Sequence, residues 1–297
     1  MRARTIRASV GAPMQASLPF LLPLLSAFLY ALAALVLKRA TERGVGPWRV
    51  SFVSNWILAA VFVPFWLMGG KPFAFEHLWH AALCGFFFFV GQIFTFLALS
   101  RGDVSVATPV LGTKVIFVAF FSVMLGAEVL TGAMWLAALL TTIATALLGM
   151  GRPRGEHSLL AGLFFGSSAA ASFALTDVLC QKWAPLWGFG HFAPVMFGTV
   201  ALCSVGLIPF FNGPLRALPW RWVLPGGLLL GIQCSGVAYS IMVFGSATTT
   251  NIIYNSRGIW SVLLVWSVGH WFANLERTQG TPVMLRRLAG SVLLLAA

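Results

Sequence analysis

Apolar stretches long enough to cross a membrane follow one another along almost the whole chain. A helix needs about 20 apolar residues to span the roughly 30 Å hydrocarbon core of a bilayer, because each residue adds about 1.5 Å. Of the 297 residues, 59% are hydrophobic and only 9% are charged, which excludes an ordinary soluble domain. We therefore predict an all-α membrane protein with ten transmembrane helices. The expected spans cover approximately residues 19–37, 48–69, 78–99, 104–125, 132–150, 158–180, 192–211, 222–244, 248–270 and 281–297.

The positive charge fits a membrane surface better than a nucleic acid. The formal net charge is +12, but most Lys and Arg residues lie in short connections between spans, where they contact lipid headgroups and set topology. We expect the lipid bilayer, and no nucleic acid, as the macromolecular environment. The cysteines show neither CxxC nor His/Cys spacing, so no metal site, cofactor or disulfide framework is expected. They are Cys84, Cys180, Cys203 and Cys234.

Three arginines precede the first apolar stretch and give the N-terminus a superficial likeness to a signal peptide. The apolar part extends from about Leu18 to Leu37, however, which exceeds the roughly 7–15 residues of a signal core. We interpret residues 1–18 as an N-terminal tail and the apolar part as the first span.

The two halves of the chain match each other at a nearly constant offset. Lys114 falls on Arg257, and the two are the cations nearest the middle of apolar spans. Further matched positions pair Gly44, Gly46 and Trp48 with Gly188, Gly190 and Phe192, and Trp79, Gly85 and Gln92 with Trp220, Gly226 and Gln233. One such match is weak, but the ordered set predicts a duplication.

An odd number of spans in each copy gives the two copies opposite orientations in the membrane. The predicted units are residues 19–150 and 158–297, joined by the polar segment 151–157. Inverted repeats of this kind are typical of secondary transporters, which bind substrate between the halves near the bilayer midplane.

The span count and the duplication are accompanied by the arrangement ALSRGDVSVATPVLGTKVIFVAFFSVMLGAEVLTG. In these three features the chain resembles the drug/metabolite transporter superfamily, and specifically its ten-helix EamA-like members. The resemblance covers nearly the whole chain. It implies that both termini are cytoplasmic and that the fourth and ninth helices line the central cavity. The last span departs from the pattern, because only about ten apolar residues follow Arg287, so we expect helix ten to be truncated.

The distribution of basic residues conflicts with that expected orientation. The end of the bundle that carries the N-terminus has fewer Lys and Arg residues than the opposite end, so the positive-inside rule alone places the N-terminus outside. Orientation stays open at this stage. The basic residues at the N-terminal end are Arg2, Arg4, Arg7, Lys71 and Lys182.

Two cations inside apolar spans must be compensated. Each costs about 2.5–3.5 kcal/mol at the centre of a membrane helix on insertion scales. Of the seven acidic residues, only Asp177 is expected inside a span, which is too few carboxylates for both cations. Lys114 and Arg257 therefore bind either a substrate anion or, as structural residues, backbone carbonyls and water. Arg257 stays charged under ordinary conditions, whereas a desolvated Lys114 is able to lose its proton.

Helical spacing adds further candidates for the binding site. Thr250, Tyr254, Arg257 and Ser261 recur at intervals of three or four residues, with Asn251 and Asn255 beside them. Lys114 shares its face with apolar residues, so one wall is polar and the other apolar, which favours an organic anion over an inorganic one. The remaining candidates are Gln92 and Gln233, for which interhelical bonding is an equal alternative, together with Tyr30, Asn55 and Tyr239.

Asp177 has two interpretations. Expected near the end of the sixth span and shortly before Lys182, it is either a proton-coupling carboxylate or an interfacial charge paired locally. The resemblance adds a comparison: small multidrug-resistance relatives use a glutamate in the first helix for cationic drugs, and this first helix contains no acid. Phosphate-translocating relatives place cations in helices four and nine, as here. Both points favour an anion.

No catalytic, nucleotide-binding or metal-binding motif occurs, so we do not expect an enzyme. We predict a secondary transporter in the cell (inner) membrane, monomeric or homodimeric. It moves a small organic anion or zwitterion, such as a phosphorylated metabolite or an amino-acid-like molecule, by alternating access. The alternatives are an exporter of neutral or amphipathic metabolites with structural cations, and a lipid-handling protein or membrane enzyme.

Overall fold

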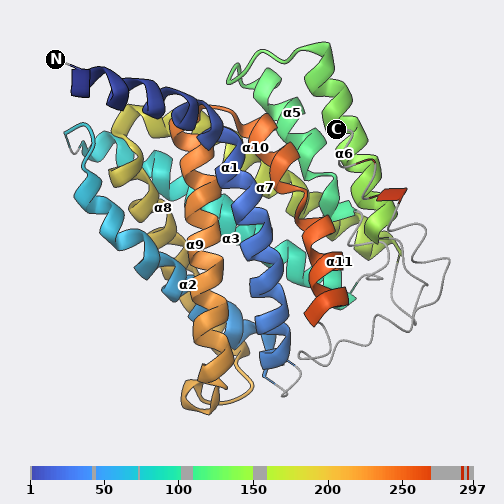
Figure 1. Ribbon diagram of the computed structural model, residues 1–297. Coiled ribbons are helices and arrows are strands. Elements are labelled where there is room, and N and C mark those ends of the chain that lie inside the picture. Colours follow the sequence, from blue (N-terminus) through green and yellow to red (C-terminus); the bar gives the residue numbers. More distant parts are fainter. Residues whose placement is uncertain are drawn as a thin grey trace.

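A computed structural model describes residues 2–41, 45–72, 74–101, 110–149, 159–268, 289–290 and 293 (Figure 1). Within these residues, helices are the only regular elements. The α-helices are α1 (Arg2–Thr41), α2 (Pro47–Phe62), α3 (Leu78–Arg101), α5 (Lys114–Met124), α6 (Gly132–Gly149), α7 (Leu159–Trp187), α8 (Phe189–Ser204), α9 (Trp220–Phe244), α10 (Ala247–Tyr254) and α11 (Arg257–Val268). Short 3₁₀ helices are η1 (Val63–Met68), η2 (Phe75–His77), η3 (Val205–Phe210) and η4 (Leu215–Ala217).

Six helical segments in the described residues are long and apolar enough to cross a membrane, and two shorter apolar helices accompany them. The protein is therefore a multi-span, all-helical membrane protein, as predicted. The six are Ser17–Ala40, Pro47–Met68, Phe75–Arg101, Leu160–Trp187, Phe189–Phe210 and Trp220–Phe244, and the shorter two are Val110–Met124 and Gly132–Leu147. The expected linker 151–157 and nearly all of the expected tenth span lie outside the described residues.

The expected N-terminal tail is helical from Arg2. Helix α1 has 40 residues, so at about 1.5 Å per residue it is much longer than the bilayer core is thick. Figure 1 shows the first part of α1 running across one end of the bundle before the helix turns into it.

Two of the predicted spans end or break at unexpected places. The sixth continues to Trp187 as α7 instead of ending near residue 180, so Asp177 lies well inside the helix. The ninth is divided at Asn255 and Ser256 into α10 and α11. Asn and Ser side chains compete with helical backbone bonds, and Asn255 donates its amide to Thr145 Oγ1 at 2.6 Å.

The fourth span has a matching interruption. Helical residues 110–112 are followed by a turn at Thr113, whose hydroxyl donates to the Val110 carbonyl at 2.6 Å, and α5 then begins at Lys114. The two matched cations, Lys114 and Arg257, therefore each occupy the first position of a helix directly after a turn.

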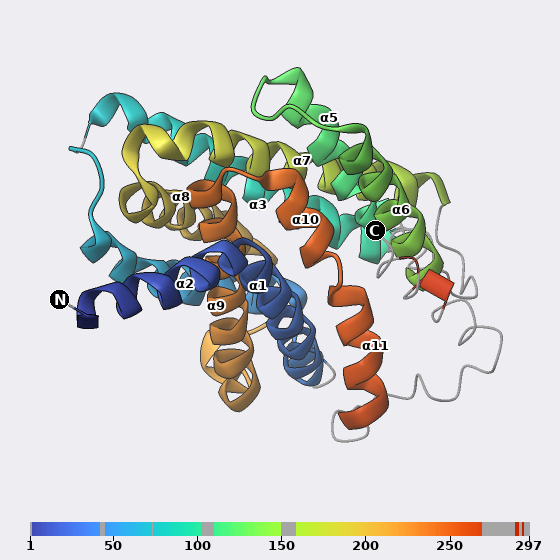
Figure 2. The same ribbon diagram turned by 45° about the horizontal axis from the view of Figure 1, so that its top comes forward.

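Helices from the two halves of the chain pack against each other in exchanged pairs (Figure 2). Helix α3 packs mainly against α7 and α8, and the corresponding α9 packs mainly against α1 and α2. A Cβ at Gly85 would collide with the Met196 carbonyl of α8, so this glycine permits the close approach of α3. Helix α3 of the first half and α9 of the second half thus each pack mainly against helices of the opposite half.

The largest apolar cluster fills one end of the bundle. It joins the C-terminal part of α7, most of α8 and the C-terminal half of α9 to α2 and α3. Phe62 and Phe197 stack at its centre with ring centroids 4.0 Å apart, and both are fully buried or nearly so. This end of the protein is consequently packed with apolar side chains.

Candidate functional site

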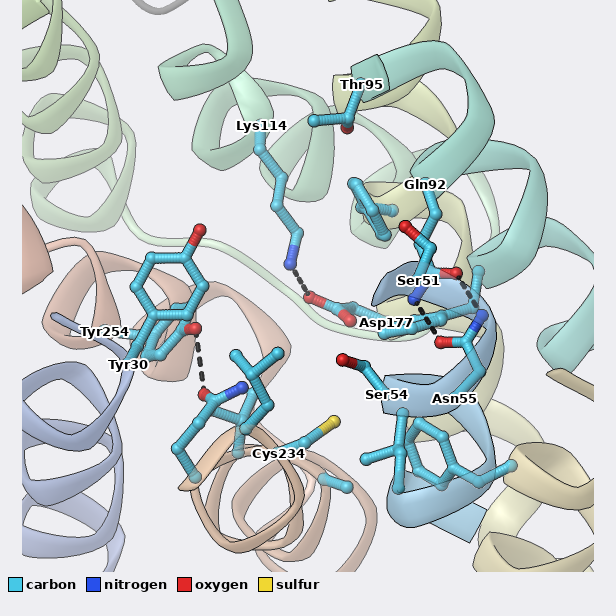
Figure 3. Close-up of a pocket in the computed structure, with 18 of the residues that line it drawn as sticks. Tyr30, Ser51, Ser54, Asn55, Gln92, Thr95, Lys114, Asp177, Cys234 and Tyr254 are labelled. Atoms are coloured by element: carbon cyan, nitrogen blue, oxygen red, sulfur yellow. Dashed lines mark hydrogen bonds and ion pairs between the residues drawn. The ribbon is translucent and has the colours of Figure 1, made fainter. Parts of the chain in front are cut away.

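A cavity of about 570 Å³ lies between the helices and contains most of the predicted site residues (Figure 3). Helices α1, α2, α3, α5, α7, α8, α9, α10 and α11 all contribute to its wall, together with Leu111. Its polar and charged lining residues are Tyr30, Ser51, Ser54, Asn55, Gln92, Thr95, Lys114, Asp177, Gln233, Tyr254 and Arg257. The remaining lining residues are apolar side chains, among them Phe88, Phe96, Phe173 and Phe197, and the thiols Cys180 and Cys234.

Lys114 forms an ion pair with Asp177 across the cavity. The distance from Lys114 Nζ to Asp177 Oδ2 is 2.7 Å, and the two side chains are 16% and 13% exposed. Asn251 Nδ2 donates to the same carboxylate oxygen at 2.7 Å, which ties α10 to α7. The Lys114 ammonium also lies 5.9 Å from the centroid of the Phe173 ring. One of the two cations is thus neutralised within the protein.

Asp177 was expected near the end of its helix as one alternative, an interfacial charge paired locally, but the structure places it well inside α7 and pairs it with Lys114 of α5. Because α7 continues to Trp187, Asp177 and Lys182 lie on one helix about 7.5 Å apart along its axis and on different faces. Lys182 Nζ instead donates to the Leu125 carbonyl at 2.9 Å. The assumption that α7 ends near residue 180 underlies that alternative.

Arg257 has aromatic neighbours in place of a carboxylate. Its Cζ atom lies 5.0 Å from the centroid of Tyr30 and 4.9 Å from that of Tyr254, within the range of cation–π attraction. The two rings meet edge to face at 6.0 Å. Tyr254 is held in place by a hydrogen bond from its hydroxyl to Gln233 Oε1 at 2.9 Å. Among the described residues, no acidic side chain is within salt-bridge distance of the guanidinium.

The two matched amides both reach the cavity, but each is also bound to another side chain. Gln92 and Asn55 exchange two hydrogen bonds of 2.9 Å, which join α3 to α2. Gln233 accepts from Tyr254. Each amide therefore orients a neighbour and retains surface towards the cavity.

Three other predicted residues lie outside the cavity lining. Asn255 donates to Thr145 of α6 and so belongs to the turn before α11. Tyr239 packs edge to face against Phe189 and Phe244, with ring centroids 5.1 and 5.6 Å away. Ser261, one helical turn after Arg257, is partly buried on α11 but does not reach the cavity.

Four polar residues of the lining, Ser51, Ser54, Thr95 and Cys234, were not predicted. On α2, Ser51 and Ser54 precede the recognised Asn55 by four residues and one residue, so the first shares its face. On α3, Thr95 stands three residues after Gln92. Extending the helical spacing from the predicted amides would have found Ser51 and Thr95.

Among the described residues, the lining of the cavity extends towards one end of the bundle. Its lining extends to Leu37 near the end of α1, Val50 in the first turn of α2, and Leu99 in the last turn of α3. Leu99 is 41% exposed. In the opposite direction the lining merges with the apolar cluster, to which Met196 and Met242 also belong.

A set of polar contacts ties the helices together at that closed end. Gln181 Oε1 accepts from the backbone N–H of Ala247 at 2.7 Å, and its Nε2 donates to the Ala127 carbonyl at 3.0 Å. Together with the bond from Lys182 to Leu125, these contacts join α7 to the end of α5 and the start of α10. We call this group, Gln181 and Lys182 with their backbone partners, the end clamp.

Comparison with known proteins agrees with this architecture. Residues 17–150 match the EamA-like transporter family, part of the drug/metabolite transporter superfamily. No curated protein matches the sequence. A crystal structure described only as that of a protein is 16% identical and superposes with a TM-score of 0.69, over 93% of this chain and 96% of its own. At that identity the likeness concerns the fold alone.

Proposed function

We propose that this protein, whose residues 17–150 match the EamA-like transporter family, is a secondary carrier that moves a small organic anion or zwitterion by alternating access. The family match indicates a membrane transporter of the drug/metabolite type, and members of the family are transporters. The single observation that supports an anionic or zwitterionic substrate is the environment of Arg257. Arg257 faces the cavity between two aromatic rings, partly buried and, within the described residues, without a carboxylate partner.

The charges of the lining favour a substrate with one negative group. Lys114 and Arg257 supply two positive charges and Asp177 supplies one negative charge. Because Lys114 and Asp177 neutralise each other, one positive charge is left for a ligand. A carboxylate or sulfonate forms two parallel hydrogen bonds with a guanidinium, and these are among the strongest that proteins make.

The rest of the wall favours an organic body attached to that group. Apolar side chains make up most of the lining, and Phe88, Phe96 and Phe173 provide aromatic surface. An inorganic anion would leave this surface in contact with water, whereas an aromatic or aliphatic substituent covers it.

We place the carrier in the cell (inner) membrane with the cavity open to the cytoplasm in the state described. The end that the cavity reaches also carries the larger share of basic residues, among them Arg39, Arg49 and Arg101. By the positive-inside rule this end is cytoplasmic. The rule then places the N-terminus outside, contrary to the orientation expected from the family resemblance.

Transport by reconstituted protein tests the proposal. Proteoliposomes are loaded with benzenesulfonate, phenylalanine or phenyl phosphate, and counterflow of each labelled compound is compared for wild type, Arg257→Gln and Arg257→Lys. We expect the sulfonate or the amino acid to be transported, Gln to abolish transport and Lys to retain part of it. Arg221→Gln is the matched control, since Arg221 also lies over an aromatic ring, that of Trp222 at 5.4 Å, but outside the cavity.

The same assay separates the alternatives. Normal transport of an anion by Arg257→Gln contradicts the anion site. Transport of a neutral compound such as benzyl glucoside by wild type and Arg257→Gln alike favours the exporter of neutral metabolites, with both cations structural. Movement of a fluorescent phospholipid between leaflets, without counterflow of any soluble compound, favours the lipid-handling protein.

A further inference from the structure

The ion pair between Lys114 and Asp177 has a geometry that accommodates two protonation states. Both contacts to the carboxyl group, from Lys114 and from Asn251, use the oxygen Oδ2 (Figure 3). The Asn251 amide is itself oriented by a second bond to the Ala247 carbonyl at 2.9 Å. An amide N–H donates equally to a carboxylate or to the carbonyl oxygen of a carboxylic acid. Asn251 therefore holds Asp177 in place whether or not a proton is bound.

Two cations of the cavity wall lie near Asp177. Lys114 faces it from α5 and Arg257 lies within electrostatic reach from α11. The other ionisable side chains that line the cavity are thiols and phenols. They are Cys180 on α7, Cys234 on α9, Tyr254 on α10 and Tyr30 on α1.

We propose that Asp177 is a proton-binding site and that its protonation releases Lys114 as a second group for the substrate anion. The inference rests on the proposed function and adds a coupling ion to it. An anion that enters the cavity neutralises positive charge and adds negative charge near Asp177, and both changes favour a proton on the carboxyl group. By thermodynamic linkage, the proton in turn strengthens anion binding by the same factor.

The charge balance fixes the stoichiometry of this coupling. One monoanion and one proton enter together, the proton bonds to an oxygen of Asp177, and the Lys114 ammonium passes from the carboxylate to the anion. The net charge of the cavity is the same before and after binding. When both leave, the ion pair forms again, so the empty carrier returns without a free lysine in its cavity.

Binding of benzenesulfonate to the purified full-length chain tests the inference, because a sulfonate stays ionised throughout the accessible pH range. Titration calorimetry in buffers of different ionisation enthalpy measures the protons taken up per ligand bound. We expect uptake by wild type, with affinity falling about tenfold per pH unit where the empty protein has lost the Asp177 proton. Asp177→Asn keeps the binding to Arg257 and shows neither the uptake nor the pH dependence.

Two further variants keep the test decisive. Glu128→Gln removes an acid at the closed end, near the start of α10, and should behave as wild type. If Asp177→Asn does not fold, Lys114→Gln/Asp177→Asn removes both charges and is expected to bind without proton uptake.

The outcomes distinguish this inference from the proposed function. Affinity of wild type that does not change with pH, or pH dependence that survives in the Asp177 variants, overturns the proton site while leaving an anion carrier. Absence of benzenesulfonate binding by wild type, together with failed counterflow for every anion, overturns the carrier and the proton site together.

Discussion

Lys114 and Arg257 occupy matching positions in the two halves of the chain, yet their surroundings differ. Each begins a helix directly after a turn, and each lines the same cavity. Lys114 meets a carboxylate at 2.7 Å, whereas Arg257 lies between the faces of two tyrosines. The backbone places a cation at an equivalent position in both halves, and the side chains that contact each cation determine whether it can also bind a ligand.

The difference follows from the chemistry of the two side chains. An ammonium is a compact, strongly hydrated charge, and out of water it needs a close counter-ion. A guanidinium is planar and more weakly hydrated, so aromatic faces can replace part of its hydration shell. Arginine can therefore stay charged and unpaired beside a cavity where lysine cannot. Of the two matched cations, Lys114 is thus paired with a carboxylate, and Arg257 has no such partner among the described residues.

The largest expected effect comes from removing the carboxylate of the pair. Asp177→Ala leaves the Lys114 ammonium partly buried without a counter-ion, and loss of one partner of a buried pair costs about 3–5 kcal/mol of stability. Thermal or denaturant unfolding in detergent should show this loss. Lys114→Met/Asp177→Leu, which removes both charges, should recover most of it. Arg257→Ala is the comparison, and we expect it to cost less stability. An equally large loss of stability in Arg257→Ala would contradict the distinction between a paired and an unpaired cation.

Neutralising Arg257 should act on ligand affinity more than on stability. Arg257→Gln removes a charge-assisted hydrogen bond to the anion, worth about 1.5–3 kcal/mol, which corresponds to about a 10- to 150-fold weaker binding of benzenesulfonate. Lys114→Gln should weaken the same binding less at alkaline pH, where Asp177 holds Lys114. Equal losses for the two variants at alkaline pH would show that the anion contacts both cations alike.

Removing the hydroxyl groups of the two tyrosines beside Arg257 should change the stability by smaller and unequal amounts. Tyr254→Phe removes the hydrogen bond to Gln233 while keeping the ring, so we expect a loss of about 0.5–1.5 kcal/mol in stability. Tyr30→Phe keeps its ring as well and should cost less. Unfolding curves of the two variants, measured side by side, test whether the Gln233 bond fixes the aromatic wall. The idea is contradicted if Tyr30→Phe is the more damaging change.

The smallest effect is expected from a lysine outside the cavity. Lys182→Gln removes an exposed contact to the Leu125 carbonyl, and exposed charges of this kind contribute about 0–1 kcal/mol. Affinity for benzenesulfonate should be unchanged, so this variant is the negative control for the variants of Lys114 and Arg257. A change in affinity here would mean that the end clamp and the cavity are coupled.

Much of the helical framework could be predicted from the sequence, because a bilayer imposes length and hydrophobicity on every span. The matched cations, the two glutamines and Tyr254 were found from spacing and duplication, and the structure brings them around one cavity. Their role in binding stays a prediction. Helical periodicity identified these residues because side chains three or four positions apart lie on the same face of a helix over several turns.

The partner of Lys114 could not be predicted in the same way. Asp177 belongs to the other half of the chain, and its place depends on where α7 ends, which apolar composition leaves uncertain by a full turn or more. The division of the ninth span at Asn255 was also missed. There the side-chain bond to Thr145 is formed with a helix distant in sequence, and no local pattern reports it.

In the proposed alternating-access mechanism, the end clamp affects how fast the protein turns over. In that mechanism, opening towards the other end separates α5, α7 and α10 where Gln181 and Lys182 join them. Each of these hydrogen bonds contributes only about 0.5–1.5 kcal/mol net, so a few of them form a weak latch beside the apolar cluster. Such rearrangements of packed helices take microseconds to milliseconds. Shortening the Gln181 side chain should therefore raise the rate of opening while leaving affinity for the cargo nearly unaltered.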